Sequence, residues 1–256
     1  MPDALRFAFG TLTALPVRVH RWDRDAARAG MRAAPLVGLI LGLFASAVSG
    51  ALALGTGPLP AAVAAIAVPA ALTRGLHLDG LADTADGLGS AKPPAEALAV
   101  MKRSDIGPFG VLTLVFTVLA QVAAVTTLYD ENGWPHAALG LTTALVCGRL
   151  SLVLACSPSI PPARPDGLGA AVAGTVPQRG AWALTATTTA TLAAASWTLD
   201  GPAAALTTTA SVALGLTASN LLLRHCVRRL GGTTGDVFGA LTETATTTTL
   251  LCLAFT

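Results

Sequence analysis

Long runs of apolar residues alternate with short polar segments along the whole chain. A helix needs about 20 consecutive apolar residues to cross a bilayer, and seven runs are of about this length. The runs cover residues 34–54, 61–76, 109–128, 136–156, 181–199, 203–223 and 237–256. The second run is the shortest, and its end is the least sharply marked. The pattern predicts an all-α, polytopic integral membrane helix bundle with about seven transmembrane helices, in a single domain covering residues 1–256.

Charged residues are few and unevenly distributed. Hydrophobic residues make up 53% of the chain and charged residues 12%, about half of the ~25% usual in soluble domains. With seven crossings, all 16 Lys and Arg residues fall on one side of the membrane or at helix ends that face it. The positive-inside rule therefore predicts a multi-pass protein of the plasma membrane, with its N-terminus and basic loops in the cytoplasm. The net charge of +2 is too small to indicate nucleic-acid binding.

Three aspartates stand at the inner end of the second apolar run, in the segment RGLHLDGLADTADGLGS of residues 74–90. In a helix, residues four and seven positions apart lie within about 60° of one another, so Asp79, Asp83 and Asp86 would share one face. Three neighbouring carboxylates repel one another and raise one another's pKa, and a divalent cation relieves that repulsion. Hard oxygen ligands favour Mg²⁺ or Mn²⁺. We therefore predict that these three aspartates bind Mg²⁺.

An ordinary connecting loop is the alternative interpretation of this segment. Its four glycines would suit a loop, and loops between membrane helices often carry acidic residues. The residues between the aspartates are mostly apolar, however, unlike those of a solvated linker. A carboxylate also costs roughly 2.5–3.5 kcal/mol at the centre of a membrane helix, so that intramembrane carboxylates are usually functional.

Several loops on the same side combine basic residues, glycine and aspartate. They are MKRSDIGPFG at residues 101–110, ARPDGLG at 163–169 and RRLGGTTGD at 228–236. Backbone N–H groups of a glycine-rich turn at a helix N-terminus form an anion-binding concavity. For any single loop, basic residues that only hold it in the cytoplasm are the simpler explanation.

Taken together, these loops beside a carboxylate cluster favour a phosphate site. Metal ions and cationic groups supply most of the catalysis of phosphoryl transfer. The candidate substrate-binding residues are Arg74, Lys102, Arg103, Asp105, Arg164, Arg228, Arg229, Gly231, Gly232, Thr234 and Asp236.

Four motifs resemble those of the cobalamin synthase family. They are LHLDGLADTADGL at residues 76–88, the pattern MK-S-IG-FG between residues 101 and 110, the turn at 164–169 and GGTTGDVFGA at 231–240. The resemblance extends in order over almost the whole chain, from APLVGLILG at residues 34–42 to the last apolar run. The charges of Arg103 and Asp105 are exchanged relative to the family pattern, so the resemblance does not fix their individual roles.

This family consists of adenosylcobinamide-GDP ribazoletransferases, integral membrane enzymes of the last joining step in vitamin B12 assembly. The resemblance implies a Mg²⁺-dependent transfer of the phosphocobinamide group from adenosylcobinamide-GDP to α-ribazole, or to its 5′-phosphate, with release of GMP. The 5′-hydroxyl of ribazole would attack the phosphorus on the cobinamide side of the diphosphate. These substrates and the lipid bilayer are the implied partners. The oligomeric state, including a homo-oligomer, and the preferred form of ribazole stay open.

The attacking hydroxyl needs a base, and His77 and Asp86 are the two candidates near the predicted metal. On an ideal helix His77 lies about 160° away from the face of Asp79, a poor position for contact with the substrate. Asp86 stands at the end of the carboxylate row, next to Gly87, where a hydroxyl has room to approach. We expect Asp86 to be the catalytic base and His77 to have a structural role, unless the helix breaks at Gly80.

Three other kinds of membrane protein also use carboxylates that bind cations. CDP-alcohol phosphotransferases show DG-x-x-AR followed by two later aspartates, whereas Ala82 is followed here by Asp83. Polyprenyl transferases carry Asn- and Asp-rich motifs in two separate loops, and this chain has one such cluster. An ion-coupled transporter is the non-enzyme alternative, but the polar groups gather toward one side of the membrane. Release of GMP from adenosylcobinamide-GDP distinguishes the first interpretation from these three.

Overall fold

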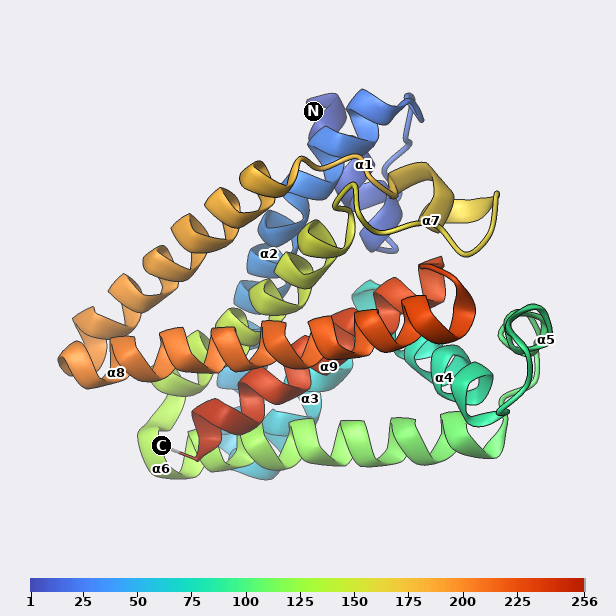
Figure 1. The fold of residues 1–256 in the computed structure, drawn as a ribbon. Helices are drawn as coiled ribbons and strands as arrows, with labels where there is room; N and C mark the ends of the chain where they lie inside the picture. The colour runs from blue at the N-terminus through green and yellow to red at the C-terminus, as the bar shows by residue number, and fades with distance from the viewer. Residues whose placement is uncertain (256) are drawn as a thin grey trace.

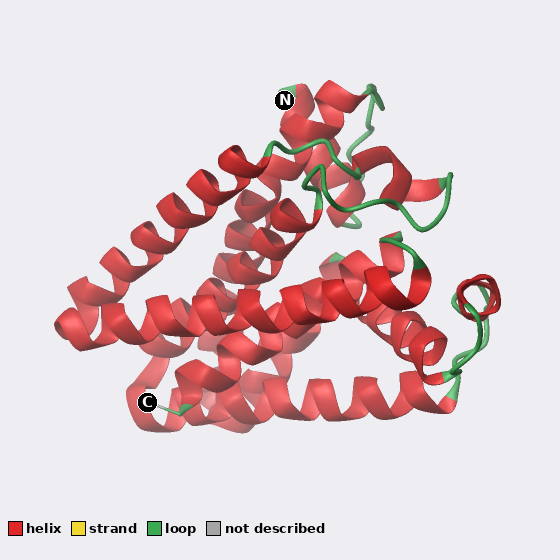
Figure 2. Ribbon diagram, in the orientation of Figure 1, coloured by secondary structure: helices red, strands yellow, loops and turns green. Residues whose placement is uncertain are grey.

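The computed structural model describes residues 1–255, except for the side chain of Asn132. This part of the chain forms nine helices and no strand, as Figures 1 and 2 show. The helices are α1 (Asp3–Leu12), α2 (Arg24–Thr56), α3 (Pro58–Leu72), α4 (Leu76–Gly89), α5 (Pro94–Val100), α6 (Pro108–Ala155), α7 (Gly167–Val172), α8 (Gln178–Leu230) and α9 (Gly235–Ala254).

Five helices are long and apolar enough to cross a membrane, or six if the bent pair of α3 and α4 forms one span. The five are α2, α8, α9 and the two arms of α6, Pro108–Glu131 and Gly133–Ala155. This count includes α8 once, although α8 leaves helical geometry at Asp200 and Gly201 and folds back there. If the bent pair of α3 and α4 counts as one segment and the two arms of α8 are counted separately, the number of apolar segments is seven. The prediction of an all-α membrane bundle is confirmed, and its count of about seven is close.

The bends of α6 and α8 depend on glycines in the left-handed region of backbone conformation. Gly133 and Gly201 both have φ of 74°, which a residue without a Cβ adopts at little cost. Figure 1 shows these bends and the end of α9 on one side of the bundle, and α1, α5 and α7 on the other. The basic loops predicted to hold phosphate therefore lie together, on the side of α5 and α7.

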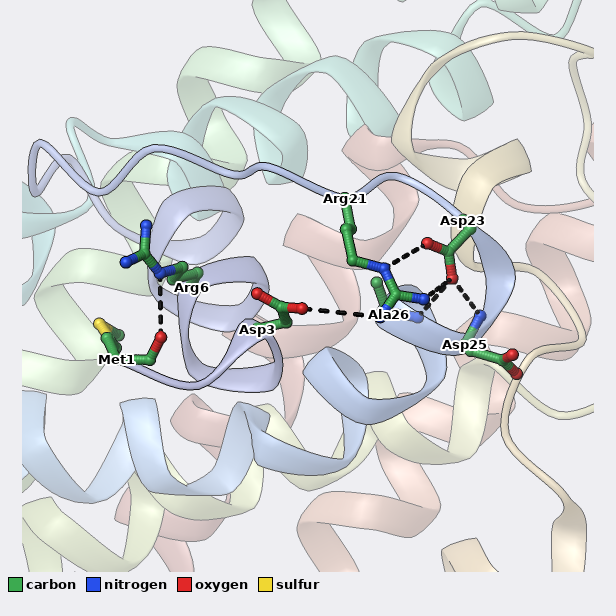
Figure 3. A network of polar contacts seen from close by, with 7 residues as sticks. All are labelled: Met1, Asp3, Arg6, Arg21, Asp23, Asp25 and Ala26. Carbon is green, nitrogen blue, oxygen red and sulfur yellow. Dashed lines mark hydrogen bonds and ion pairs between the residues drawn. The ribbon is translucent and has the colours of Figure 1, made fainter.

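The α2 helix begins at Arg24, ten residues before the apolar run that predicted it. The Asp23 carboxylate caps this start by accepting hydrogen bonds from the N–H groups of Asp25 and Ala26, each at 3.1 Å. Arg21 binds the same carboxylate at 2.8 Å and lies 3.6 Å from Asp3 of α1 (Figure 3). Polar residues can thus form the first turns of a membrane helix, which a search for apolar runs misses. The last predicted run ends at Thr256, which lies outside the described residues.

The aspartates lie on a helix of their own. α3 ends at Leu72 and α4 begins at Leu76, and the two helices meet at an angle of 88°. Arg74 and Gly75 make the corner, with φ of 53° and 70°. The predicted run of residues 61–76 therefore spans a corner, but the prediction of a helix through the three aspartates is confirmed.

Candidate active site

The α4 and α9 helices cross with their backbones in contact. A Cβ added to Gly80 would lie 2.6 Å from the carbonyl oxygen of Asp236, and one added to Gly239 would lie 2.9 Å from that of His77. No side chain fits at either position without a shift of backbone. The crossing places the first turn of α9 directly beside the row of aspartates on α4.

Three carboxylates meet at this crossing. Asp79 is exposed, and Asp83 and Asp236 are partly exposed. Asp79 and Asp236 lie close enough to Asp83 for their negative charges to repel it, and Asp86 adds a weaker repulsion. The predicted row of aspartates therefore gains a fourth member from the other end of the sequence. Asp236 was predicted to bind substrate and was not expected to join the carboxylates.

The position of Asp236 follows from the turn that opens α9. The Thr234 hydroxyl accepts a hydrogen bond from the N–H of Val237 at 3.2 Å, which caps the helix. The same hydroxyl lies 3.2 Å from a carboxylate oxygen of Asp236 and donates to it. Gly231, with φ of 85°, ends α8 in the left-handed region, and Gly232 packs against the backbone of residues 161–163. The glycine-rich turn predicted to bind phosphate therefore also shapes the carboxylate cluster.

Arg164 is the basic residue that the contacts bring closest to the carboxylates. Its Nη1 lies 3.9 Å from Asp236, and its Nη2 donates a hydrogen bond to the carbonyl of Leu98. Its loop is fixed by two backbone hydrogen bonds to Thr233, one from Ala163 N–H (2.8 Å) and one to the Pro161 carbonyl (2.9 Å). Arg164 is therefore held between α5 and the start of α9, with its positive charge beside the carboxylates.

The other basic candidates lie farther out. Lys102 is exposed and forms an ion pair of 4.0 Å with Asp166, while its charge also acts on Asp236. The guanidinium of Arg229 donates a hydrogen bond of 3.4 Å to the carbonyl of Lys92. The remaining charged candidates are exposed, and in residues 1–255 no ion pair joins them to the aspartates; they are Arg74, Arg103, Asp105 and Arg228.

Asp86 has a different environment from its two partners on α4. It is 7% exposed, and its carboxylate accepts hydrogen bonds from the N–H groups of Gly107 (2.7 Å) and Gly110 (2.9 Å). These donors belong to the start of α6, where N–H groups lack partners within the helix and negative charge is favourable. A Cβ on either glycine would lie 2.5 Å from an Asp86 oxygen. Asp86 therefore ties the IGPFG segment to α4.

His77 faces away from the carboxylates, as its helical position predicts. The side chain is 4% exposed, whereas Asp79 is exposed. Its neighbours include the buried guanidinium of Arg149, and its Nε2 has no hydrogen-bond partner among the described residues. Its environment is that of an interior group.

The carboxylate cluster is suited to a hard divalent cation by its chemistry. Asp79, Asp83 and Asp236 supply oxygen ligands, which Mg²⁺ prefers, and their mutual repulsion would be relieved by a cation. Within the described residues no group of three acidic, His or Cys side chains already converges at ligand distances. Mg²⁺ commonly takes one or two carboxylates together with substrate phosphates, and this cluster can provide the carboxylates.

A group of polar side chains beneath the crossing was not predicted from the sequence. Arg149 and Glu243 occur inside the fourth and seventh apolar runs, and charged residues at such positions are rare and usually have partners. Arg149 was grouped with the helix ends that face the basic side, but it lies six residues inside the end of α6 at Ala155. A charged residue within an apolar run is the signal in the sequence that could have revealed this group.

Comparison with known proteins agrees with the motifs. A family model described as cobalamin-5-phosphate synthase matches residues 4–254. A protein of Nocardioides sp. (strain JS614) named adenosylcobinamide-GDP ribazoletransferase is 44% identical over 257 residues, which cover 99% of each chain. A protein of the same name from Frankia casuarinae is 43% identical over 265 residues, 98% of this chain and 94% of the relative. No solved structure matches the chain. The chain therefore belongs to the cobalamin-5-phosphate synthase family.

Proposed function

We propose that the protein joins α-ribazole, or its 5′-phosphate, to adenosylcobinamide-GDP and releases GMP. In this reaction the oxygen of a ribose hydroxyl that is free in both forms of ribazole bonds to the phosphorus on the cobinamide side of the diphosphate. The expected 5′-hydroxyl cannot serve for both forms, because it is already esterified in the 5′-phosphate. The bond from that phosphorus to the bridging oxygen breaks, and GMP leaves with the electron pair. The observation that carries the proposal is the carboxylate cluster at the α4–α9 crossing, with Arg164 beside it, in a chain of this family.

The cationic groups around the cluster are suited to the diphosphate. Arg164 and Lys102 both act on the charge of Asp236, so an anion seated at the cluster would lie near both. The start of α9 adds backbone N–H groups and a helix N-terminus, which favour negative charge. We assign Arg164 and Lys102 to the diphosphate. Arg74, Arg228 and Arg229 are proposed for the outer part of the nucleotide.

We further propose that the reaction depends on Mg²⁺ held by Asp79, Asp83 and Asp236. Asp86 was predicted as a metal ligand, and its hydrogen bonds to the start of α6 place it at the edge of the cluster. When it is bound, Mg²⁺ supplies positive charge that neutralises the diphosphate oxygens and the leaving GMP. The three carboxylates would hold the cation between α4 and α9, and Arg164 and Lys102 would orient the diphosphate beside it.

Proton removal from the ribazole hydroxyl is assigned to Asp86, with His77 as the alternative. Asp86 acts electrostatically on Asp83, whereas His77 is enclosed beside Arg149. The two N–H donors hold the Asp86 carboxylate in one orientation beside the cluster. An oriented carboxylate at that position can accept the proton if the cation also acidifies the hydroxyl.

We place the site at the cytoplasmic face of the plasma membrane. The supporting observation is that the bends of α6 and α8 lie opposite the loops that carry the basic residues (Figure 1). Basic loops are retained in the cytoplasm. Access of a membrane-impermeant thiol reagent to single cysteines at Ser104 and Ala203, in intact cells and in inverted vesicles, tests this orientation.

The proposed activity is tested with purified protein in detergent. Incubation with adenosylcobinamide-GDP, α-ribazole and Mg²⁺ should release GMP and form the joined corrinoid in equal amounts. Omission of ribazole, and the Asp83→Ala variant, are the controls that should release none. Equal GMP release without ribazole would mean hydrolysis rather than transfer. If the protein instead releases CMP from a CDP-alcohol, the alternative phosphotransferase assignment is correct.

A further inference from the structure

Five polar side chains of α4, α6 and α9 gather beneath the α4–α9 crossing, on the side away from the aspartates. We call them the inner polar cluster: His77, Gln121, Arg149, Glu243 and Thr246. They come from α4, both arms of α6, and α9. Three of them carry buried polar atoms without a hydrogen-bond partner among the described residues, namely His77 Nε2, Arg149 Nε and Thr246 Oγ1.

A small cavity lies at the centre of the inner polar cluster. Its volume is about 30 Å³, and all five side chains line it. One water molecule needs roughly 10–15 Å³ and two to four polar partners. Engineered apolar cavities stay dry. Six apolar residues share this lining, but a guanidinium, a carboxylate, an amide, an imidazole and the hydroxyls of Thr73 and Thr246 face the same space. Its size and its lining both suit water.

The charges of the cluster face each other without direct contact. Arg149 is 2% exposed, and it interacts electrostatically with Glu243. Yet no ion pair of 4.0 Å or less joins them in residues 1–255. Glu243 instead accepts a hydrogen bond of 2.8 Å from Gln121, and Arg149 Nη1 donates a hydrogen bond of 3.4 Å to the Leu145 carbonyl. A buried charge without partners carries a heavy desolvation penalty, so the gap between the two charges calls for a bridging group.

We propose that the cavity holds ordered water that bridges Arg149 to Glu243 and to His77. Water donates to the Glu243 carboxylate and accepts from Arg149 Nε, and it can serve either tautomer of His77. It is neutral, so it completes the ion pair without adding charge. The Thr246 hydroxyl supplies a further partner for it.

This water-filled cluster would position the aspartate helix. His77 and Glu243 belong to the two helices that cross, and the crossing is what places Asp79 and Asp83 beside Asp236. Arg149 anchors both to α6. Arg149 and Glu243 are thus positioning residues, acting on the reaction through α4. This last step rests on the proposed function, whereas the water and the ion pair do not.

The water is tested on the wild-type protein by a cryo-EM or crystallographic map that resolves ordered solvent. Density should lie in the cavity within hydrogen-bond distance of Arg149 Nε and His77 Nε2. An empty cavity, or a direct contact of Arg149 with Glu243 that fills it, would overturn the proposal.

The positioning role is tested with Glu243→Gln, which nearly preserves shape but removes the charge. Thr249→Val is the matched control, because Thr249 is a buried threonine of α9 outside the cavity. Glu243→Gln should lower the melting temperature and reduce kcat at least tenfold with little change in KM. Adding Arg149→Met should recover part of the lost melting temperature, because both charges are then removed. If the double variant loses the summed melting temperature of the two single variants, the two charges are not paired, whatever the fate of the proposed activity. If the protein is active and kcat is unchanged in Glu243→Gln, the positioning role is contradicted.

Discussion

Gly80 of α4 lies so close to Asp236 of α9 that a Cβ on the glycine would come within 2.6 Å of the aspartate's carbonyl oxygen. Two segments more than 150 residues apart in the sequence thereby form one carboxylate cluster. The backbone at Gly80 is regular helix, so the glycine is not needed for an unusual backbone conformation. It is needed because it lets the two helices approach closely. The distance between the two helices decides whether Asp79, Asp83 and Asp236 can act together.

Replacing Gly80 by alanine should therefore disrupt both stability and activity. Forcing a methyl group into this contact costs roughly 1–3 kcal/mol, and any shift of α4 from α9 separates the carboxylates. Gly180→Ala is the matched control, because Gly180 lies in α8 with open space around its Cβ position. Thermal unfolding in detergent and the GMP-release assay measure the two effects. A Gly80→Ala protein with wild-type stability and activity would show that the helices do not meet in this way.

Arg164 should matter more to catalysis than the arginines at the end of α8. Losing a charged hydrogen bond to the diphosphate costs roughly 1.5–3 kcal/mol, so Arg164→Ala should lose roughly 10- to 150-fold in kcat/KM. Arg18→Ala, an exposed arginine near the N-terminus, serves as the control for a simple loss of charge.

The double change of Arg228 and Arg229 to alanine tests the outer part of the proposed nucleotide site. We expect a raised KM for adenosylcobinamide-GDP with a smaller change in kcat, because these groups would bind the substrate rather than the reacting phosphorus. If KM and turnover both stay at wild-type values, the two arginines only hold the loop on its side of the membrane.

Asp86 should prove important for structure whether or not it takes the proton. Asp86→Ala removes the acceptor for two N–H groups at the start of α6, and loss of a helix cap costs about 0.5–2 kcal/mol. The melting temperature of the variant measures this loss. Stability equal to that of the wild type would show that the cap contributes nothing.

The choice between the two proposed bases depends on pH–rate profiles with the chemical step rate-limiting. We expect Asp86→Asn to lose activity and His77→Ala to retain the wild-type profile shape at a reduced rate. The opposite result, loss in His77→Ala alone together with a titration near the ordinary histidine value of about 6.5, would assign the proton to His77.

The sequence was sufficient for the fold class and for the aspartate helix. Apolar runs locate membrane helices because every backbone polar group in a bilayer must be satisfied within the protein. The spacing of Asp79, Asp83 and Asp86 correctly predicted a helix there. The start of α2 and the corner at Arg74 were missed, because caps and left-handed turns depend on local polar contacts rather than on hydrophobicity.

Contacts between distant segments could not be derived from one sequence. Nothing in the motif containing Asp236 says that its helix crosses α4, and the role of Gly239 in that contact appears only in three dimensions. In the same way, the hydrogen bonds from the start of α6 to the Asp86 carboxylate appear only in three dimensions. Arg149 and Glu243 were visible as charges within apolar runs, but their common cavity was not.

The central claim is that carboxylates of α4 and α9 form one divalent-cation site. Binding of Mn²⁺, as a substitute for Mg²⁺, to purified protein in detergent can be followed by electron paramagnetic resonance without any substrate. We predict tight binding of Mn²⁺ to the wild type and to Asp25→Ala, an exposed aspartate near the start of α2. Binding should be weakened at least tenfold in Asp79→Ala, Asp83→Ala and Asp236→Ala alike. Wild-type affinity in Asp236→Ala would contradict a site shared by the two helices, and wild-type affinity in all three variants would contradict the metal site itself.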